Sequence, residues 1–154
     1  MEIKELCVGM IAPNFTLIGS DDQSHCLHDY KGKKVVLYFY PRDNTPGCTT
    51  QAQAFRDAFD QFNDKNTVIL GVSRDSVTTH KNFVKKHDLP FILLSDFEEI
   101  AVNLYGVLKE KMMYGKKAIG IERSTFVINE EGVIEHIYRK VKVKDHLCEL
   151  QAIL

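Results

Sequence analysis

The stretch YFYPRDNTPGCTTQAQAFRD, residues 38–57, joins the end of an apolar run to the start of a helical pattern. The run that it ends, KKVVLYFYP, is rich in β-branched and aromatic residues, which predicts a strand buried on both faces. After the turn, Thr45 and Pro46 suit an N-cap and a first helical position. Cys48 therefore stands in the first turn of a helix that follows a strand, which is where open α/β sheets bind ligands.

The rest of the chain alternates between strand and helix patterns. Short alternating segments around a polar turn in residues 12–30 predict an N-terminal β-hairpin. Alternating strands and helices are typical of an α/β fold with parallel strands, and a C-terminal hairpin makes the expected sheet mixed. The expected elements are strands at 66–73 and 90–96, helices at 45–62, 76–89, 97–107 and 144–154, and a hairpin at 121–141. The segment 109–120 is polar and contains glycines, and no element is assigned to it.

Size, charge and composition exclude several classes of function. A chain of 154 residues fits one domain, residues 1–154, whose core needs neither disulfides nor a structural metal. The formal net charge of −1 gives no reason to expect nucleic acid or an anionic membrane as a partner. No apolar run spans a bilayer and the N-terminus does not read as a signal peptide, so we expect a cytoplasmic protein. The histidines lack ligand spacing, so we expect no metal.

Cys48 has surroundings that favour a reactive thiol. The thiolate is the nucleophilic form of cysteine, and a helix N-terminus or a nearby cation lowers the pKa of a thiol. Thr45 brings a hydroxyl group three residues before the sulfur, and Gly47 lets the backbone approach a small ligand closely. Pro41 and Pro46 stiffen the turn. This stretch is therefore suited to thiolate attack on a compact, polar substrate.

Several motifs together resemble the peroxiredoxins. Pro41, Thr45 and Cys48 reproduce the peroxiredoxin signature Pro-x-x-x-Thr-x-x-Cys, and the chain is similar to the bacterioferritin-comigratory, or PrxQ, branch over nearly its whole length. The resemblance implies a thioredoxin-like fold, with a central mixed sheet flanked by helices and extended by an N-terminal β-hairpin. The segments that carry it are APNFTL, DYKGKKVVLYFYPRDNTPGCTT, GVSRDSV with His80, LPFILLSD and YGKKAIGIERSTFVIN.

The resemblance also implies an activity and a set of site residues. The expected reaction is thiol-dependent reduction of hydrogen peroxide and organic hydroperoxides, in which Cys48 becomes a sulfenic acid and no cofactor takes part. Arg123 is implied as the cationic neighbour of Cys48. The Thr45 hydroxyl and the backbone N–H groups near Gly47 and Cys48 are implied as further donors to the peroxide oxygens, and Pro41 as a shield against water.

This chain departs from the branch at the positions that usually carry a second, resolving cysteine. Many members have that cysteine five residues after the first, where this chain has Gln53, and others have it at the position that we align with Val84. Five residues along a helix rotate by about 140° and rise by roughly 7.5 Å, so the relatives with the first arrangement must unwind the helix locally to form the disulfide. The usual intramolecular disulfide cannot form here. Gln51 also stands where an acidic residue is common.

The sequence therefore leaves several candidates for the group that reduces the sulfenic acid. We favour a one-cysteine cycle in which an external thiol, from thioredoxin, glutaredoxin or glutathione, reduces Cys48. The alternatives are another cysteine of the chain, Cys148 or Cys26, and a cysteine of a second subunit; we expect a monomer or a weak homodimer. A non-catalytic redox sensor is the rival function. A thiol–disulfide oxidoreductase is disfavoured because Cys48 begins no Cys-x-x-Cys motif.

Overall fold

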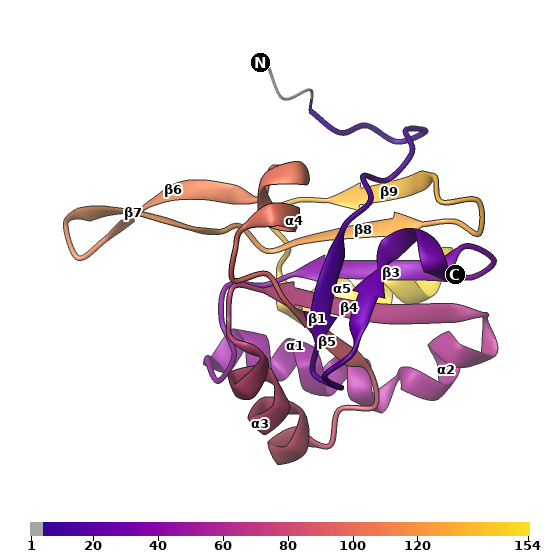
Figure 1. The fold of residues 1–154 in the computed structure, drawn as a ribbon, viewed down its shortest axis with the longest axis horizontal. Helices are drawn as coiled ribbons and strands as arrows, with labels where there is room; N and C mark the ends of the chain where they lie inside the picture. Colours follow the sequence, from indigo (N-terminus) through magenta and orange to yellow (C-terminus); the bar gives the residue numbers. More distant parts are fainter. Residues whose placement is uncertain (1–4) are drawn as a thin grey trace.

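The computed structural model describes residues 5–154, without the side chains of Lys111 and Met113, and is built around a seven-stranded mixed sheet (Figure 1). The strand order is β2-β1-β5-β4-β3-β8-β9, with β3, β4 and β5 parallel and the outer strands antiparallel to their neighbours. The strands are β1 (Thr16–Gly19), β2 (Ser24–Cys26), β3 (Lys34–Phe39), β4 (Thr67–Ser73), β5 (Ile92–Ser95), β8 (Ser124–Ile128) and β9 (Ile134–Tyr138).

β3 lies at the centre of this sheet because its side chains are apolar on both faces. All of its residues after Lys34 are buried, which confirms the strand expected to be covered on both sides. It pairs in parallel with β4, Val36 opposite Ile69, and antiparallel with β8, Phe39 opposite Ser124. The carboxyl end of β3 therefore lies beside the start of β8.

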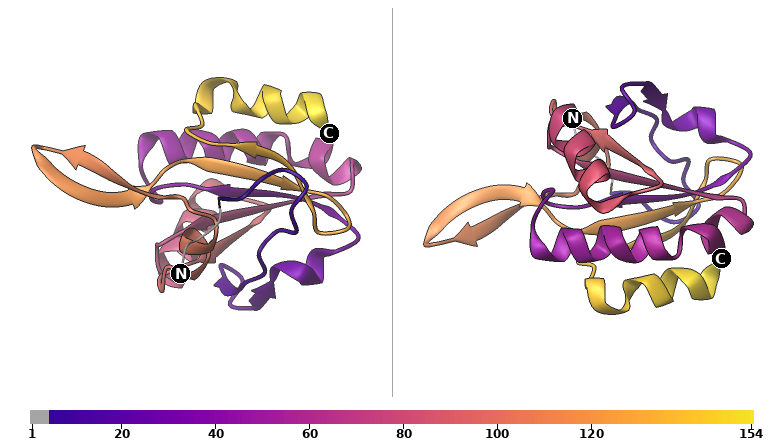
Figure 2. Two further views of the ribbon diagram at one scale, coloured as in Figure 1. Left: turned by 90° about the horizontal axis from the view of Figure 1, so that it is seen from above. Right: turned by 90° about the horizontal axis from the view of Figure 1, so that it is seen from below.

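Helices cover both faces of the sheet (Figure 2). One apolar core packs beneath α1 and α5, and the other beneath α4 and the N-terminal segment with its 3-10 helix. The predicted N-terminal hairpin and the hairpin formed by β8 and β9 are both confirmed. The helical elements are α1 (Pro46–Asp57), α2 (Phe59–Asp64), α3 (Val77–His87), α4 (Ile100–Leu104), α5 (Val143–Ile153) and the 3-10 helix Leu27–Tyr30.

Three elements differ from the sequence-based expectation. The helix expected over residues 45–62 is two helices, α1 and α2, which meet at Ala58. The helix expected over 97–107 is reduced to α4. The segment 109–120, which had no assigned element, lies in a separate hairpin of β6 (Leu108–Met113) and β7 (Lys116–Ile121) that projects from the body of the protein (Figure 1).

The β6–β7 hairpin escaped sequence analysis for a physical reason. Only its base packs on a core, through Leu108 and Ile121, so the rest of the hairpin lacks the apolar alternation that identifies a half-buried strand. Its turn is formed by Tyr114 and Gly115, both with positive φ (53° and 77°), as in the two-residue turns that match the twist of a hairpin. Met112 and Tyr114 are largely or fully exposed.

Within residues 5–154, no helix combines the length and the apolarity that crossing a membrane requires.

Candidate active site

Cys48 lies where the sequence predicted, in the first turn of α1 just after β3. Thr45 is the N-cap in an extended conformation, and Pro46 occupies the first helical position. Asn44 precedes this cap with a positive φ of 64°, a left-handed conformation that asparagine tolerates better than most residues. The Cys48 side chain is buried, with 2% of its surface exposed, against the aromatic residues of β3 and α1.

Arg123 is the cation beside the sulfur. Its Nη2 donates to the Cys48 Sγ over 3.3 Å. Sheet register explains the meeting of residues that are 75 positions apart: Ser124 pairs with Phe39 at the end of β3, so Arg123 just before β8 reaches the start of α1. Val141 donates its N–H to the Arg123 carbonyl over 3.0 Å and holds that backbone in place. The predicted proximity of Arg123 and Cys48 is present in the structure.

Gly47 makes room for this arginine. A Cβ atom at position 47 would lie 3.3 Å from Arg123 Nη2, closer than most side chains tolerate. The structure shows that Gly47 permits close approach of the guanidinium, whereas its expected role in the approach of a ligand stays a prediction.

Gln51 is a site residue that sequence analysis did not assign. Its Oε1 accepts a hydrogen bond from Arg123 Nη1, and only 3% of its surface is exposed. Its Nε2 is buried and has no hydrogen-bond partner among residues 5–154. The sequence did contain a signal for this role: Gln51 follows Cys48 by three residues, and residues three apart share one face of a helix.

Thr45 differs in one respect from its expected role as a donor to the substrate. Its hydroxyl donates to the Arg42 carbonyl over 2.9 Å. A hydroxyl has one proton and two lone pairs, so toward any other partner Thr45 is an acceptor. The hydroxyl also makes no capping bond to α1, so the N–H groups of Gly47 and Cys48 receive no acceptor from Thr45. Pro41 is half-buried at the start of this loop.

Tyr38 adds a buried phenol close to the site. Burial raises its pKa well above the ordinary value, and the nearby charges of Asp43 and Cys48 raise it further. Its hydroxyl has no hydrogen-bond partner among the described residues. The group stays neutral and retains its proton.

The other three cysteines are free thiols. Cys148 is exposed on α5, away from its buried Leu150, as the sequence pattern indicated. Cys26 is half-buried, and its Sγ donates to Asn14 Oδ1 over 3.3 Å. Cys7 is exposed near the N-terminus.

The two positions where the resemblance led us to expect a resolving cysteine lie at the interface of two helices, Gln53 in α1 and Val84 in α3. Gln53 Nε2 lies 3.4 Å from His87 Nδ1, and Val84 packs partly buried against the core beneath α1. The two helices are joined further by Arg56, whose Nη1 donates to the His87 carbonyl over 2.9 Å. In this chain the interface between α1 and α3 is closed by hydrogen bonds and packing.

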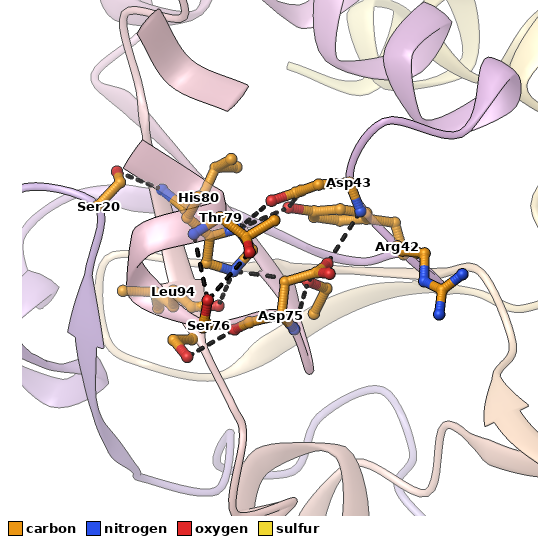
Figure 3. Close-up of polar contacts among 12 residues, drawn as sticks. Ser20, Arg42, Asp43, Asp75, Ser76, Thr79, His80 and Leu94 are labelled. Atoms are coloured by element: carbon orange, nitrogen blue, oxygen red, sulfur yellow. Dashed lines mark hydrogen bonds and ion pairs between the residues drawn. The ribbon is translucent and has the colours of Figure 1, made fainter. Parts of the chain in front are cut away.

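A second polar cluster, formed by Asp43, Asp75 and His80, lies at the other end of the Cys48 loop (Figure 3). The ligand atoms of the three residues are close enough together to hold a metal ion. His80 does not offer a lone pair for one, however, because its Nδ1 lies 2.6 Å from Asp43 Oδ2 and its Nε2 lies 3.1 Å from the Leu94 carbonyl. A carbonyl only accepts, so Nε2 carries a proton, and Nδ1 is occupied by the carboxyl group.

Comparison with known proteins assigns the chain to a family. Residues 8–137 match the AhpC/TSA family. Peroxiredoxin Bcp of Bacillus subtilis is 50% identical over 142 residues, which cover 92% of this chain and 90% of that protein. Two solved structures resemble this one over most of both chains. The bacterioferritin comigratory protein of Xanthomonas campestris, studied for alkyl peroxide reduction, has a TM-score of 0.86 at 42% identity, covering 90% of this chain and 88% of that one.

The second solved structure is a cysteine-to-serine variant of PrxQ from Xylella fastidiosa, with a TM-score of 0.92 at 40% identity, covering 97% of this chain and 96% of that one. These likenesses confirm the thioredoxin-like fold, with its mixed sheet flanked by helices. The chain belongs to the AhpC/TSA family, and within it to the Bcp, or PrxQ, group of peroxiredoxins, which are thiol-dependent peroxidases.

Proposed function

We propose that Cys48 is the peroxidatic cysteine and that it reduces hydrogen peroxide and organic hydroperoxides in a one-cysteine cycle. The observation that carries the proposal is the distance of 3.3 Å between Arg123 Nη2 and Cys48 Sγ at the N-terminus of α1. A guanidinium and the free N–H groups of a first helical turn both favour the thiolate, which is the nucleophilic form.

The first step oxidises the sulfur. The Cys48 thiolate attacks the terminal oxygen of the hydroperoxide, and a sulfur–oxygen bond forms as the oxygen–oxygen bond breaks. The electron pair of that bond leaves with the second oxygen, which takes up a proton and departs as an alcohol, or as water when the substrate is hydrogen peroxide. Cys48 is left as a sulfenic acid, oxidised by two electrons.

The surrounding groups stabilise the transition state of this step. Negative charge moves from the sulfur to the departing oxygen, so fixed donors near both atoms bind the transition state more tightly than the ground state. In the proposal these donors are Arg123 and the N–H groups of Gly47 and Cys48. The Thr45 hydroxyl accepts a hydrogen bond from the terminal O–H and so orients the peroxide, and Pro41 limits access of water.

The second step requires two external thiols. The first attacks the sulfenic acid to give a mixed disulfide and water, and the second attacks that disulfide, releasing Cys48 as a thiol. This cycle is supported by Gln53 and Val84, which stand at the usual resolving positions, and by the hydrogen bond that Cys26 makes to Asn14. The proposed reductants are thioredoxin, glutaredoxin or glutathione, for a cytoplasmic protein that acts as a monomer or a weak homodimer.

Intact-mass measurement after one equivalent of peroxide tests the cycle. We expect the gain of one oxygen without added thiol, and the gain of one glutathionyl group when glutathione is present. Loss of two hydrogens without added thiol would instead reveal an internal disulfide, with Cys148 or Cys26 as the resolving residue. Turnover of several equivalents of peroxide per subunit with a thiol present is expected; consumption of a single equivalent would identify a redox sensor instead.

A further inference from the structure

The peptide unit between Arg42 and Asp43 is held at both of its polar ends. Its carbonyl, from Arg42, accepts the Thr45 hydroxyl over 2.9 Å, and its N–H, from Asp43, donates to Asp75 Oδ2 over 2.9 Å. A peptide unit is planar, so the direction of the N–H fixes the direction of the carbonyl. The Arg42 side chain points away from this cluster, and only its backbone takes part (Figure 3). Asp75 thus acts on Thr45 through one rigid group.

Asp75 is itself fixed in place. Its Oδ2 also accepts the Ser73 hydroxyl over 2.5 Å, and its backbone carbonyl accepts the Ser95 hydroxyl over 2.6 Å. Ser73 ends β4 and Ser95 ends β5, so Asp75 is tied through its carboxylate to the end of β4 and through its backbone carbonyl to the end of β5. Through Asp75, these hydrogen bonds anchor the loop that precedes Cys48 to the sheet.

The Asp43 side chain provides a second anchor for the same residue. Its carboxyl group is fully buried, accepts the Tyr40 hydroxyl over 2.6 Å and lies 2.6 Å from His80 Nδ1. His80 is bound in turn to the Leu94 carbonyl on β5. The backbone and side chain of Asp43 are therefore held by different partners, Asp75 and His80, as Figure 3 shows.

We propose that Asp75, through the Arg42–Asp43 peptide, is a positioning residue that turns the Thr45 hydroxyl so that its lone pairs face the peroxide. His80 supports the same arrangement by holding the Asp43 side chain. The inference rests on the proposed role of Thr45 in binding the substrate. Without Asp75 only the Asp43 side chain anchors the peptide, and the peptide can turn so that the Arg42 carbonyl no longer accepts the Thr45 hydroxyl. The hydroxyl then presents either a proton or a lone pair to the terminal O–H of the hydroperoxide.

The proposal separates two reactions of the same sulfur. Alkylation by iodoacetamide needs the thiolate and access to it, whereas oxidation by a hydroperoxide also needs Thr45 to orient the substrate. Asp75→Ala should therefore slow oxidation of Cys48 by about 10- to 100-fold, the scale of a misplaced reacting group, and leave the alkylation rate within about twofold of the wild type. Asp75→Asn keeps an oxygen acceptor for the Asp43 N–H and should restore most of the oxidation rate.

The experiment measures both rates by stopped flow in the full chain, with Thr45→Val as the reference. If Thr45→Val oxidises at the wild-type rate, the proposed role of Thr45 is wrong, and the role of Asp75 falls with it. If Thr45→Val is slow but Asp75→Ala is not, the positioning proposal alone is overturned. It is also overturned if Asp75→Ala slows alkylation and oxidation equally, because a general loosening of the loop affects both reactions.

A second pair of variants keeps the test decisive if Asp75→Ala does not fold. The amide nitrogen of asparagine takes the place of Nδ1 and that of glutamine the place of Nε2, so His80→Asn keeps a donor for Asp43 and His80→Gln keeps one for Leu94. The proposal requires faster oxidation in His80→Asn than in His80→Gln, with equal alkylation rates. Equal oxidation rates in the two variants would overturn it.

Discussion

The Arg123 guanidinium lies between two acceptors, the Cys48 sulfur and the Gln51 amide oxygen. These two acceptors share a face of α1, three residues apart, so one planar side chain reaches both. Of the two, only the sulfur is able to carry a full negative charge. The neutral Gln51 therefore leaves the positive charge of Arg123 beside the Cys48 sulfur, whereas a carboxylate at position 51 would neutralise it.

Gln51→Glu should lower the reactivity of Cys48. A carboxylate at position 51 would neutralise Arg123 and add a negative charge near the sulfur. In a partly buried site, repulsion between like charges at such distances lowers the population of a thiolate by about one decade or more. We expect both iodoacetamide alkylation and peroxide oxidation at pH 7 to slow by about tenfold. Gln51→Met, which is neutral, is the matched control and should change the alkylation rate less. Unchanged rates in Gln51→Glu would show that the charge at position 51 does not matter.

Arg123→Ala should remove the principal donor to the reacting atoms. Loss of one well-placed donor in such a site typically costs about two to three decades in rate. Stopped-flow measurement of Cys48 oxidation is expected to show this loss without a matching loss of folded protein at the same temperature. Arg123→Lys keeps the charge but not the planar fork that reaches both Cys48 and Gln51, so it should recover part of the rate. Near-normal oxidation in Arg123→Ala would contradict the assignment.

The sequence predicted the surroundings of Cys48 but not the polar contacts that hold the loop before it, and the reason is physical. The motif around Cys48 and the apolar pattern of β3 are local, so they can be read from neighbouring residues. The pairing of Asp43 with Asp75, 32 residues away, depends on the register of β3 against β4 and on the end of β4, which periodicity does not specify. Polar clusters of this kind leave no repeating pattern in the chain.

Replacing Cys7, Cys26 and Cys148 together by serine should preserve turnover with an external thiol. In the proposed cycle no other cysteine of the chain bonds to Cys48, and two of the three lie exposed, where serine has little effect on packing. The measurement is steady-state peroxide consumption with thioredoxin or glutathione as reductant. A large loss of turnover, recovered when one cysteine is restored, would identify that cysteine as the resolving residue.

Gly71→Ala should destabilise the fold beneath the site. A Cβ atom at this position on β4 would lie 2.7 Å from Leu93 Cδ2 and 2.8 Å from the Tyr38 ring, and both side chains are buried. Overpacking of a core costs about 1–3 kcal/mol in the free energy of unfolding. Urea denaturation is expected to show this loss as a lower midpoint with an unchanged slope. A stability equal to that of the wild type would mean that Tyr38 moves aside freely.

His146 should make the stability of the protein depend on pH. Its burial lowers its pKa below the ordinary value of 6.5, and the positive charge of Arg123 adds to this, although Glu149 opposes the shift. Below about pH 6.5 the unfolded chain takes up a proton that the folded chain resists, so the free energy of unfolding falls as the pH falls toward the lowered pKa. Above pH 6.5 the contribution is fully present.

The test compares the wild type with His146→Gln in urea at about pH 7.5 and pH 5. Glutamine places a polar group near Nε2, which lies 2.8 Å from Thr125 Oγ1, and it does not titrate. The variant should therefore lose less unfolding free energy between the two pH values than the wild type does. Equal losses in the two proteins would show that other groups carry the pH dependence, and a larger loss in the variant would reverse the sign that burial of His146 requires.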